Sequence, residues 1–219
     1  MTDRPVPGAA GRTRWRRFAA LTVPAAALAG FIVLGMANGA IAASFAVSGQ
    51  TFKVSADRLE GTGFVQYGGF AQEKGGRTLP GTNIPDPTDP LNHPVAVSGI
   101  ASAKLYDLCQ SVKVPNLPVV LKINAGGGGN PAEATNLRID VTQLQGNATF
   151  TNIQIGRDAS TLEGGGPGAV GLPGQFGQQA ERVEITDLRQ VAWSTTAGTF
   201  RLTGLNLAVN TGAQATECF

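Results

Sequence analysis

The chain has 219 residues, of which 15% are charged, 6% are aromatic and 30 are glycines. This composition argues against a helical bundle and favours a β-rich fold with many glycine turns. The formal net charge is +2, but five arginines and one aspartate lie in the first 17 residues, and the remainder has 12 basic and 14 acidic side chains. No basic stripe follows in the sequence, so we expect no nucleic-acid partner.

The N-terminal part has the pattern of an export signal. Residues 1–17 form a basic cytoplasmic segment, and residues 18–42 form an apolar run without a charged side chain. A helix of this run would just cross a hydrocarbon core of roughly 30 Å. Two interpretations stay open: a signal peptide cleaved between Ala42 and Ala43, or an uncleaved transmembrane anchor formed by residues 18–42.

Both interpretations place residues 43–219 outside the cytoplasm. We therefore predict an exported domain, at the extracellular face of the plasma membrane or secreted to the cell envelope. The membrane is then a partner only through residues 18–42, if these stay attached. The two cysteines of the chain, Cys109 and Cys218, agree with an oxidising compartment, and we predict that they form a disulfide.

A four-residue cadence recurs in the exported part: an apolar residue, two mostly polar residues and a leucine. It occurs as ADRL at 56–59, LYDL at 105–108, VTQL at 141–144 and ITDL at 185–188. The residues before each copy alternate as in a half-buried strand. We predict a bulge or tight bend in each copy, at equivalent heights of the sheet, which returns the leucine to the core face. Unequal spacing between the leucines argues against a solenoid.

The rest of the exported part divides into strands and loops. Loops are predicted at residues 71–94, which hold five prolines, and at the glycine-rich segments 125–131 and 164–178. The pattern predicts a mainly β domain, either an antiparallel β-sandwich or a flattened β-roll, preceded by one N-terminal apolar helix. The strand candidates are 45–48, 51–57, 63–67, 95–98, 101–107, 111–114, 118–123, 136–144, 148–155, 182–187 and 190–209.

A serine hydrolase would need His93, the single histidine, as the base for Ser98 or Ser102 just downstream. However, the sequence lacks G-x-S-x-G, and the residues after Ser98 have the pattern of a further strand instead of a nucleophile elbow. We therefore expect His93 to lie in an exposed loop and assign no catalytic residue. The set His93, Ser98 and Ser102 belongs only to the alternative interpretation.

Metal and cofactor sites have weak support in the sequence. Asp86 and Asp89 could approach one calcium ion, but Asp-Pro turns are ordinary loop chemistry. The GGGGN segment at 126–130 is followed by proline and lacks the lysine of a phosphate-binding loop. We expect no cofactor and no metal. Strands that alternate apolar and uncharged polar residues could instead close around a lipid or another apolar ligand.

The leader RTRWRRFAALTVPAAALAGFIVLGMANGAIA continues into ASFAVSGQTFKVSADRLEGTGFVQYGG. Together these segments resemble a family of exported, signal-anchored actinobacterial proteins of unknown function, some of which are labelled cholesterol esterase. The resemblance extends over the whole chain, through ITDLRQVAWSTT to the terminal cysteine. It implies export and an envelope location, and it brings no established catalytic residues to this sequence.

These observations favour a non-enzymatic β domain of the cell envelope that binds a lipid or apolar ligand or contributes to envelope structure. One alternative is a lipid-ester hydrolase, which rests on the family label and the neighbourhood of His93. A second alternative is a calcium-dependent carbohydrate-binding module that uses Asp86 and Asp89. The sequence identifies no protein partner.

Overall fold

The computed structural model describes residues 44–46 and 49–219. The predicted leader, its cleavage site between Ala42 and Ala43 and the predicted anchor at 18–42 lie outside these residues. In the described part, no helix has the length and apolar character needed to cross a membrane.

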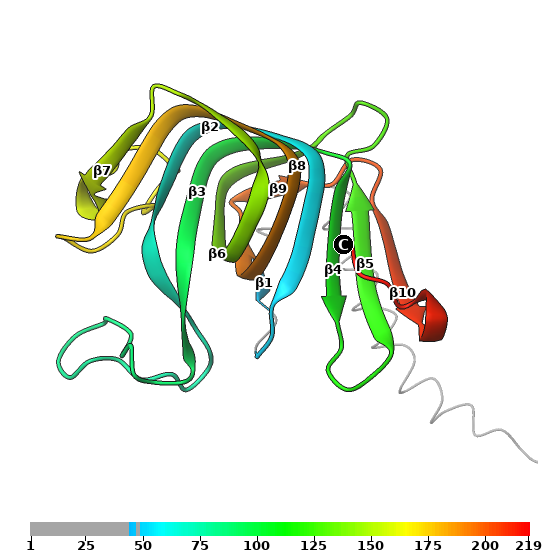
Figure 1. Cartoon of the computed structure of the whole chain (residues 1–219), viewed down its shortest axis with the longest axis horizontal. Helices are drawn as coiled ribbons and strands as arrows, with labels where there is room; N and C mark the ends of the chain where they lie inside the picture. Colours follow the sequence, from blue (N-terminus) through cyan, green and yellow to red (C-terminus); the bar gives the residue numbers. More distant parts are fainter. Residues whose placement is uncertain (1–43, 47–48) are drawn as a thin grey trace, which may run out of the picture. The chain divides into compact units, whose positions relative to one another are not determined.

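The described residues form ten strands and two single-turn 3₁₀ helices. All ten strands belong to one sheet, and every pairing is antiparallel (Figure 1). The prediction of a mainly β, antiparallel domain is confirmed. The elements are β1 (Ser44–Ala46), β2 (Phe52–Gln72), β3 (Asn92–Tyr106), β4 (Leu108–Lys113), β5 (Val119–Ala125), β6 (Ala132–Thr151), β7 (Gln154–Asp158), η1 (Ala159–Thr161), β8 (Phe176–Thr196), β9 (Thr199–Arg201), β10 (Asn206–Thr211) and η2 (Gly212–Gln214).

Four long strands make a closed ring of pairings. β2 pairs with β3 along one edge and with β8 along the other, while β6 pairs with both β3 and β8. Figure 1 shows these four strands bending over together, with β4, β5 and β10 continuing the sheet at one side. The sandwich-or-roll alternative therefore resolves into one sheet that returns onto itself, because no second, separately bonded sheet is present in the described residues.

Several strand breaks expected from the sequence are wrong. β2 begins at Phe52 and runs without a break through the predicted segments 51–57 and 63–67 from that residue on. β3 likewise runs through 95–98 and 101–107, with Tyr106 as its last residue. A break in the alternation changes the face that a strand presents, but the hydrogen-bonded ladder resumes on the far side. The structure therefore has fewer and longer strands than the pattern predicted.

Three copies of the cadence lie side by side, as expected. ADRL of β2 pairs directly with ITDL of β8 and with LYDL at the end of β3. In each copy the ladder skips one aspartate: Asp57, Asp107 or Asp187. Two of them, Asp107 and Asp187, adopt positive φ angles of 51° and 54°. These three residues make one row of interrupted pairing across neighbouring strands.

The interruption returns the leucines to the core. Leu59, Leu108 and Leu188 are only 2%, 2% and 1% exposed. The fourth copy, VTQL, is different: Leu144 is 40% exposed, so the prediction was wrong there. At Leu144, β6 no longer pairs with β3 and pairs only with β8. No described strand lies along its other edge to form a core there.

At a second row of interruptions, the alternation of side chains between the two faces of the long strands is reversed. The ladder skips Gly63, Ala101 and Asn136, with φ angles of 65° at Gly63 and 50° at Asn136. Just after it, Phe64 and Val65 are neighbours in sequence but belong to different apolar clusters. The second row therefore gives the sheet two buried faces.

The first apolar cluster fills the ring formed by the long strands, and the second lies where residues 159–169 cover the sheet. The ring is a packed core: a cavity of about 10 Å³ beside Val54, Leu137 and Phe200 has room for roughly one water molecule.

The C-terminal residues return to the middle of the sheet. Cys109 on β4 and Cys218 form a disulfide, which confirms the predicted pairing. The backbone N–H of Cys218 also donates to Ser111 Oγ at 3.0 Å, and Lys53 Nζ donates to the carbonyl of Phe219 at 2.9 Å. The tail is thus attached to both β4 and β2.

The cadence can be tested with two substitutions of the same kind. Leu188→Ala is expected to lower the free energy of unfolding by about 2–5 kcal/mol, because it leaves a cavity at a closely packed site. Leu144→Ala, at the corresponding position of the exposed copy, should cost about 0.5 kcal/mol or less. Urea denaturation measures both values. Equal losses would contradict the role of the interruption in burying the leucine.

Removing the disulfide should destabilise the domain through the unfolded state. The bond closes a loop of 109 residues, which in the chain-entropy model stabilises the native state by about 4–5 kcal/mol. The double variant Cys109→Ser/Cys218→Ser is therefore expected to unfold at much lower urea concentration than the oxidised protein. Added reductant should destabilise the native protein and leave the double variant unchanged.

Candidate functional site

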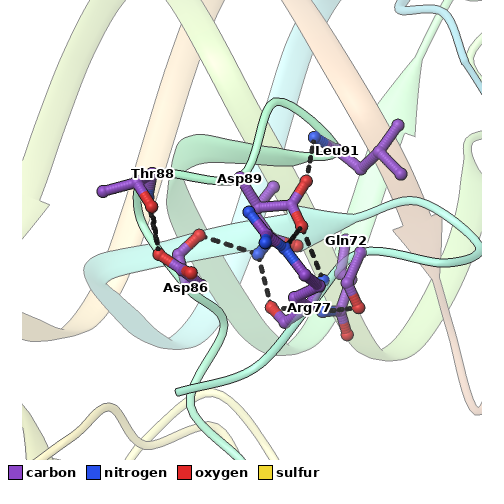
Figure 2. A network of polar contacts seen from close by, with 8 residues as sticks. Gln72, Arg77, Asp86, Thr88, Asp89 and Leu91 are labelled. Atoms are coloured by element: carbon purple, nitrogen blue, oxygen red, sulfur yellow. Dashed lines mark hydrogen bonds and ion pairs between the residues drawn. The ribbon is translucent and has the colours of Figure 1, made fainter. Parts of the chain in front are cut away.

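The long loop between β2 and β3 is held by one buried carboxylate. Asp89 Oδ2 accepts hydrogen bonds from the backbone N–H and from Nε of Arg77 at 3.0 and 2.7 Å, and its Oδ1 accepts from the N–H of Leu91 at 3.0 Å. Figure 2 shows this carboxylate between the two ends of the loop. The backbone N–H of Leu91 and the Arg77 guanidinium hold the pKa of Asp89 below its usual value, because they stabilise the charged form.

The second aspartate of the loop makes a local turn. Asp86 Oδ1 accepts from both the hydroxyl and the backbone N–H of Thr88, at 2.7 and 2.9 Å, and these hydrogen bonds lower the pKa of Asp86 (Figure 2). Asn92 Nδ2 then joins the loop by donating to the carbonyls of Arg77 and Asp86. Both carboxylates are thus engaged by donors of the loop, an arrangement that gives no support to calcium binding by Asp86 and Asp89.

His93 lies on β3 and not in a loop, so the expectation of a loop residue was wrong. The Asp89 network ends the loop early enough for β3 to begin at Asn92, and His93 pairs with Ala71 of β2. Its Nε2 lies 2.7 Å from Glu73 Oε1. Its ring stacks on the indole of Trp193, with 3.8 Å between the ring centroids and 8° between the planes.

Trp193 reaches His93 because β8 has a bulge at this point. Asp140 of β6 pairs with Ser194, but the next residue, Val141, pairs with Ala192, so Trp193 is the extra residue. Its indole packs against the second apolar cluster. The hydroxyl of Ser194 donates a hydrogen bond to Asp140 Oδ2.

These side chains surround one surface hollow of about 370 Å³, called here the His93 hollow. It brings two carboxylates, one imidazole, one indole, two hydroxyls and one ammonium together from β2, β3, β6, β8 and the start of the long loop. Its lining residues are Gly49, Ala71, Gln72, Glu73, Lys74, His93, Asp140, Trp193, Ser194 and Thr196.

The structure does not bring His93, Ser98 and Ser102 together. All three lie on β3, so Ser98 is five residues and roughly 16 Å along the strand from His93. Ser98 is buried and accepts a hydrogen bond from Gln66 Nε2 at 3.0 Å. Ser102 is exposed and lines a different hollow, of about 440 Å³, next to Thr62 and Arg182.

Sequence reasoning missed the partners that His93 does have. Glu73, Asp140, Trp193 and Ser194 come from segments far apart in the chain, and only the strand pairing gathers them. One local signal was present: the doublet Trp193-Ser194 interrupts the alternation between the buried residues Ala192 and Thr195.

Comparison with known proteins gives one match. A model of a family of unknown function, DUF6230, matches residues 48–219, which include all of the strands from β2 to β10. The chain belongs to this family. No curated protein and no solved structure matches the chain. The two hollows described above lie within this DUF6230 domain.

Acid should loosen the loop of this DUF6230 domain. The pKa of Asp89 is lowered in the folded state, so its contribution to stability is present above the unfolded value of about 3.8 and is lost as the pH falls through the lower folded value. We expect the melting temperature to fall as the pH drops below about 4, and Asp89→Asn to show a smaller acid dependence. Glu133→Gln, a change at an exposed carboxylate of β6, is the control and should keep the full dependence.

Proposed function

We propose that this chain is an exported, non-enzymatic domain of the cell envelope that binds carbohydrate in the His93 hollow. The observation that carries the proposal is the stacked pair His93–Trp193 with Glu73 and Asp140 beside it. Sugars have an apolar C–H face and a rim of hydroxyl donors. An aromatic platform flanked by carboxylate acceptors is complementary to both.

The polar groups of the hollow can serve a hydroxyl-rich ligand. Glu73 and Asp140 can accept charge-assisted hydrogen bonds from sugar hydroxyls. The hydroxyls of Ser194 and Thr196 can both donate hydrogen bonds to sugar hydroxyls and accept hydrogen bonds from them. A lipid would instead need an apolar cavity, and the described ring of strands is filled by its own side chains.

The hydrogen bonds within the hollow argue against catalysis by a serine nucleophile. A nucleophilic serine needs a base within hydrogen-bond reach. Among the described residues, His93 Nε2 is bound to Glu73 and the hydroxyl of Ser194 donates to Asp140. His93 and Ser194 are thus each paired with a carboxylate and not with one another.

Titration of the full chain, kept in detergent, with soluble oligosaccharides of glucose, arabinose or N-acetylglucosamine tests the binding proposal by calorimetry or NMR. At least one series should bind, and Trp193→Ala should weaken that binding at least tenfold, because the platform is lost. Glu73→Gln and Asp140→Asn change the acceptors with little change in shape and should weaken it less. Glu60→Gln, in the other hollow, is the matched control and should bind as the native chain does.

Two results would contradict carbohydrate binding in the His93 hollow. One is the absence of binding for every oligosaccharide series in the folded native chain. The other is equal affinity of the native chain and the Trp193→Ala variant, which would place the ligand elsewhere. An unchanged melting temperature of Glu73→Gln shows that a loss of affinity in this variant does not come from unfolding.

Lipid-ester hydrolysis is a second candidate, because one hydroxyl, one imidazole and two carboxylates line the same hollow. Ser194 would have to turn from Asp140 towards His93 to act as the nucleophile. Hydrolysis of a p-nitrophenyl ester or a cholesteryl ester that is lost in both Ser194→Ala and His93→Ala would favour this candidate. Hydrolysis that persists in both variants would exclude this pair of residues.

A further inference from the structure

The free edge of β10 differs from the other free edges of the sheet. An unpaired edge offers its N–H and C=O groups to any other strand, and proteins usually blunt it by shortness, bulges, charges or proline. β1 and β9 have three residues each, β7 has a register shift, β6 has three shifts, and the part of β3 beyond its pairing with β6 contains Pro94.

β10 carries none of these devices. It runs for six residues, NLAVNT, in unshifted register with β5, and contains no charged residue and no proline. Among the described strands it pairs with β5 alone, so its second edge has no strand beside it (Figure 1). This edge is therefore a suitable template for another strand.

The side chains of β10 also expose an apolar surface next to this edge. Leu207 is 53% and Val209 is 62% exposed. They continue two rows that begin in the interior: Leu207 lies beside the buried Ile123 of β5, and Val209 lies beside Leu121, which in turn pairs with Val112 of β4. Val112 packs against the first apolar cluster. The apolar face of the sheet thus stops abruptly at β10.

We propose that this edge pairs with β10 of a second copy of the chain, antiparallel and about a two-fold axis at Ala208. Such an axis is perpendicular to the sheet, so residues on the same face of the two copies stand opposite one another. In the register centred on Ala208, Leu207 of each copy faces Val209 of the other. The four side chains then form one continuous apolar strip.

Charge and register favour a second copy as the occupant. Because β10 has no charged residue, self-pairing brings no like charges together along the strand. The register centred on Val209 would place Leu207 against the polar Thr211, and the register centred on Leu207 would place Val209 against Leu205, which lies outside β10. The register centred on Ala208 matches both.

Cross-linking of the full chain in detergent or in membranes tests the register. Residue 208 is opposite itself in the proposed dimer, at a Cα separation of roughly 4.5–5.5 Å, which suits a disulfide. Ala208→Cys should therefore give a covalent dimer under mild oxidation. Leu144→Cys, at an exposed position on the bulged β6 edge, is the matched control and should give only background dimer. Equal cross-linking of the two variants would overturn the proposal.

A pair of double variants keeps the proposal falsifiable if the cysteine disturbs the edge. Leu207→Lys/Val209→Lys places like charges opposite one another and should sediment as a monomer at about 100 μM, where the native chain is a dimer. Leu207→Lys/Val209→Glu places opposite charges across the same axis and should restore a dimer that weakens with salt. A monomeric native chain at this concentration, or the same association state in both double variants, would contradict pairing through β10.

Discussion

The fold depends on interrupted strand pairing at positions where neighbouring strands are aligned. A closed ring of only four strands needs strong tilt and coiling, which a regular ladder resists. The row at Asp57, Asp107 and Asp187 interrupts the ladder at one height on neighbouring strands. The same row turns Leu59, Leu108 and Leu188 back into the core. The burial of these leucines therefore depends on the interruption.

The second row, at Gly63, Ala101 and Asn136, makes the candidate site possible. Beyond it, Val65 and Val97 lie on the other side of the sheet and pack in the second cluster, while Phe64 and Ile100 still pack in the first. His93 is on the same face as Val97, four residues away, and Trp193 packs against that cluster. Without the exchange of faces, the outer side of the strands would be polar, and the two aromatic rings would lack an apolar base.

The sequence predicted what is local and missed what depends on pairing between distant segments. Alternation and the recurring leucine cadence were sufficient for the β class, for the alignment of three interruptions of the ladder and for the burial of Leu188. The same pattern could not show that β2 continues through Asp57, because a bulge and a turn both break the alternation. Nor could it join Glu73, Asp140 and Trp193, which belong to three different segments. The error at Leu144 has the same origin: its burial depends on where β3 separates from β6, which is a property of the ring.

The disulfide connects the stability of the domain with both proposals. β10 lies within the segment that the Cys109–Cys218 bond closes, and it is followed by the tail that Ser111 and Lys53 hold. An ordered β10 presents a straight edge, and an ordered edge loses less conformational entropy when a second strand pairs with it. A dimer would carry two His93 hollows, so a polymeric carbohydrate could be bound at two points, and even weak single sites would then give durable attachment. The oxidising environment expected outside the cytoplasm would in this way favour both the fold and the association.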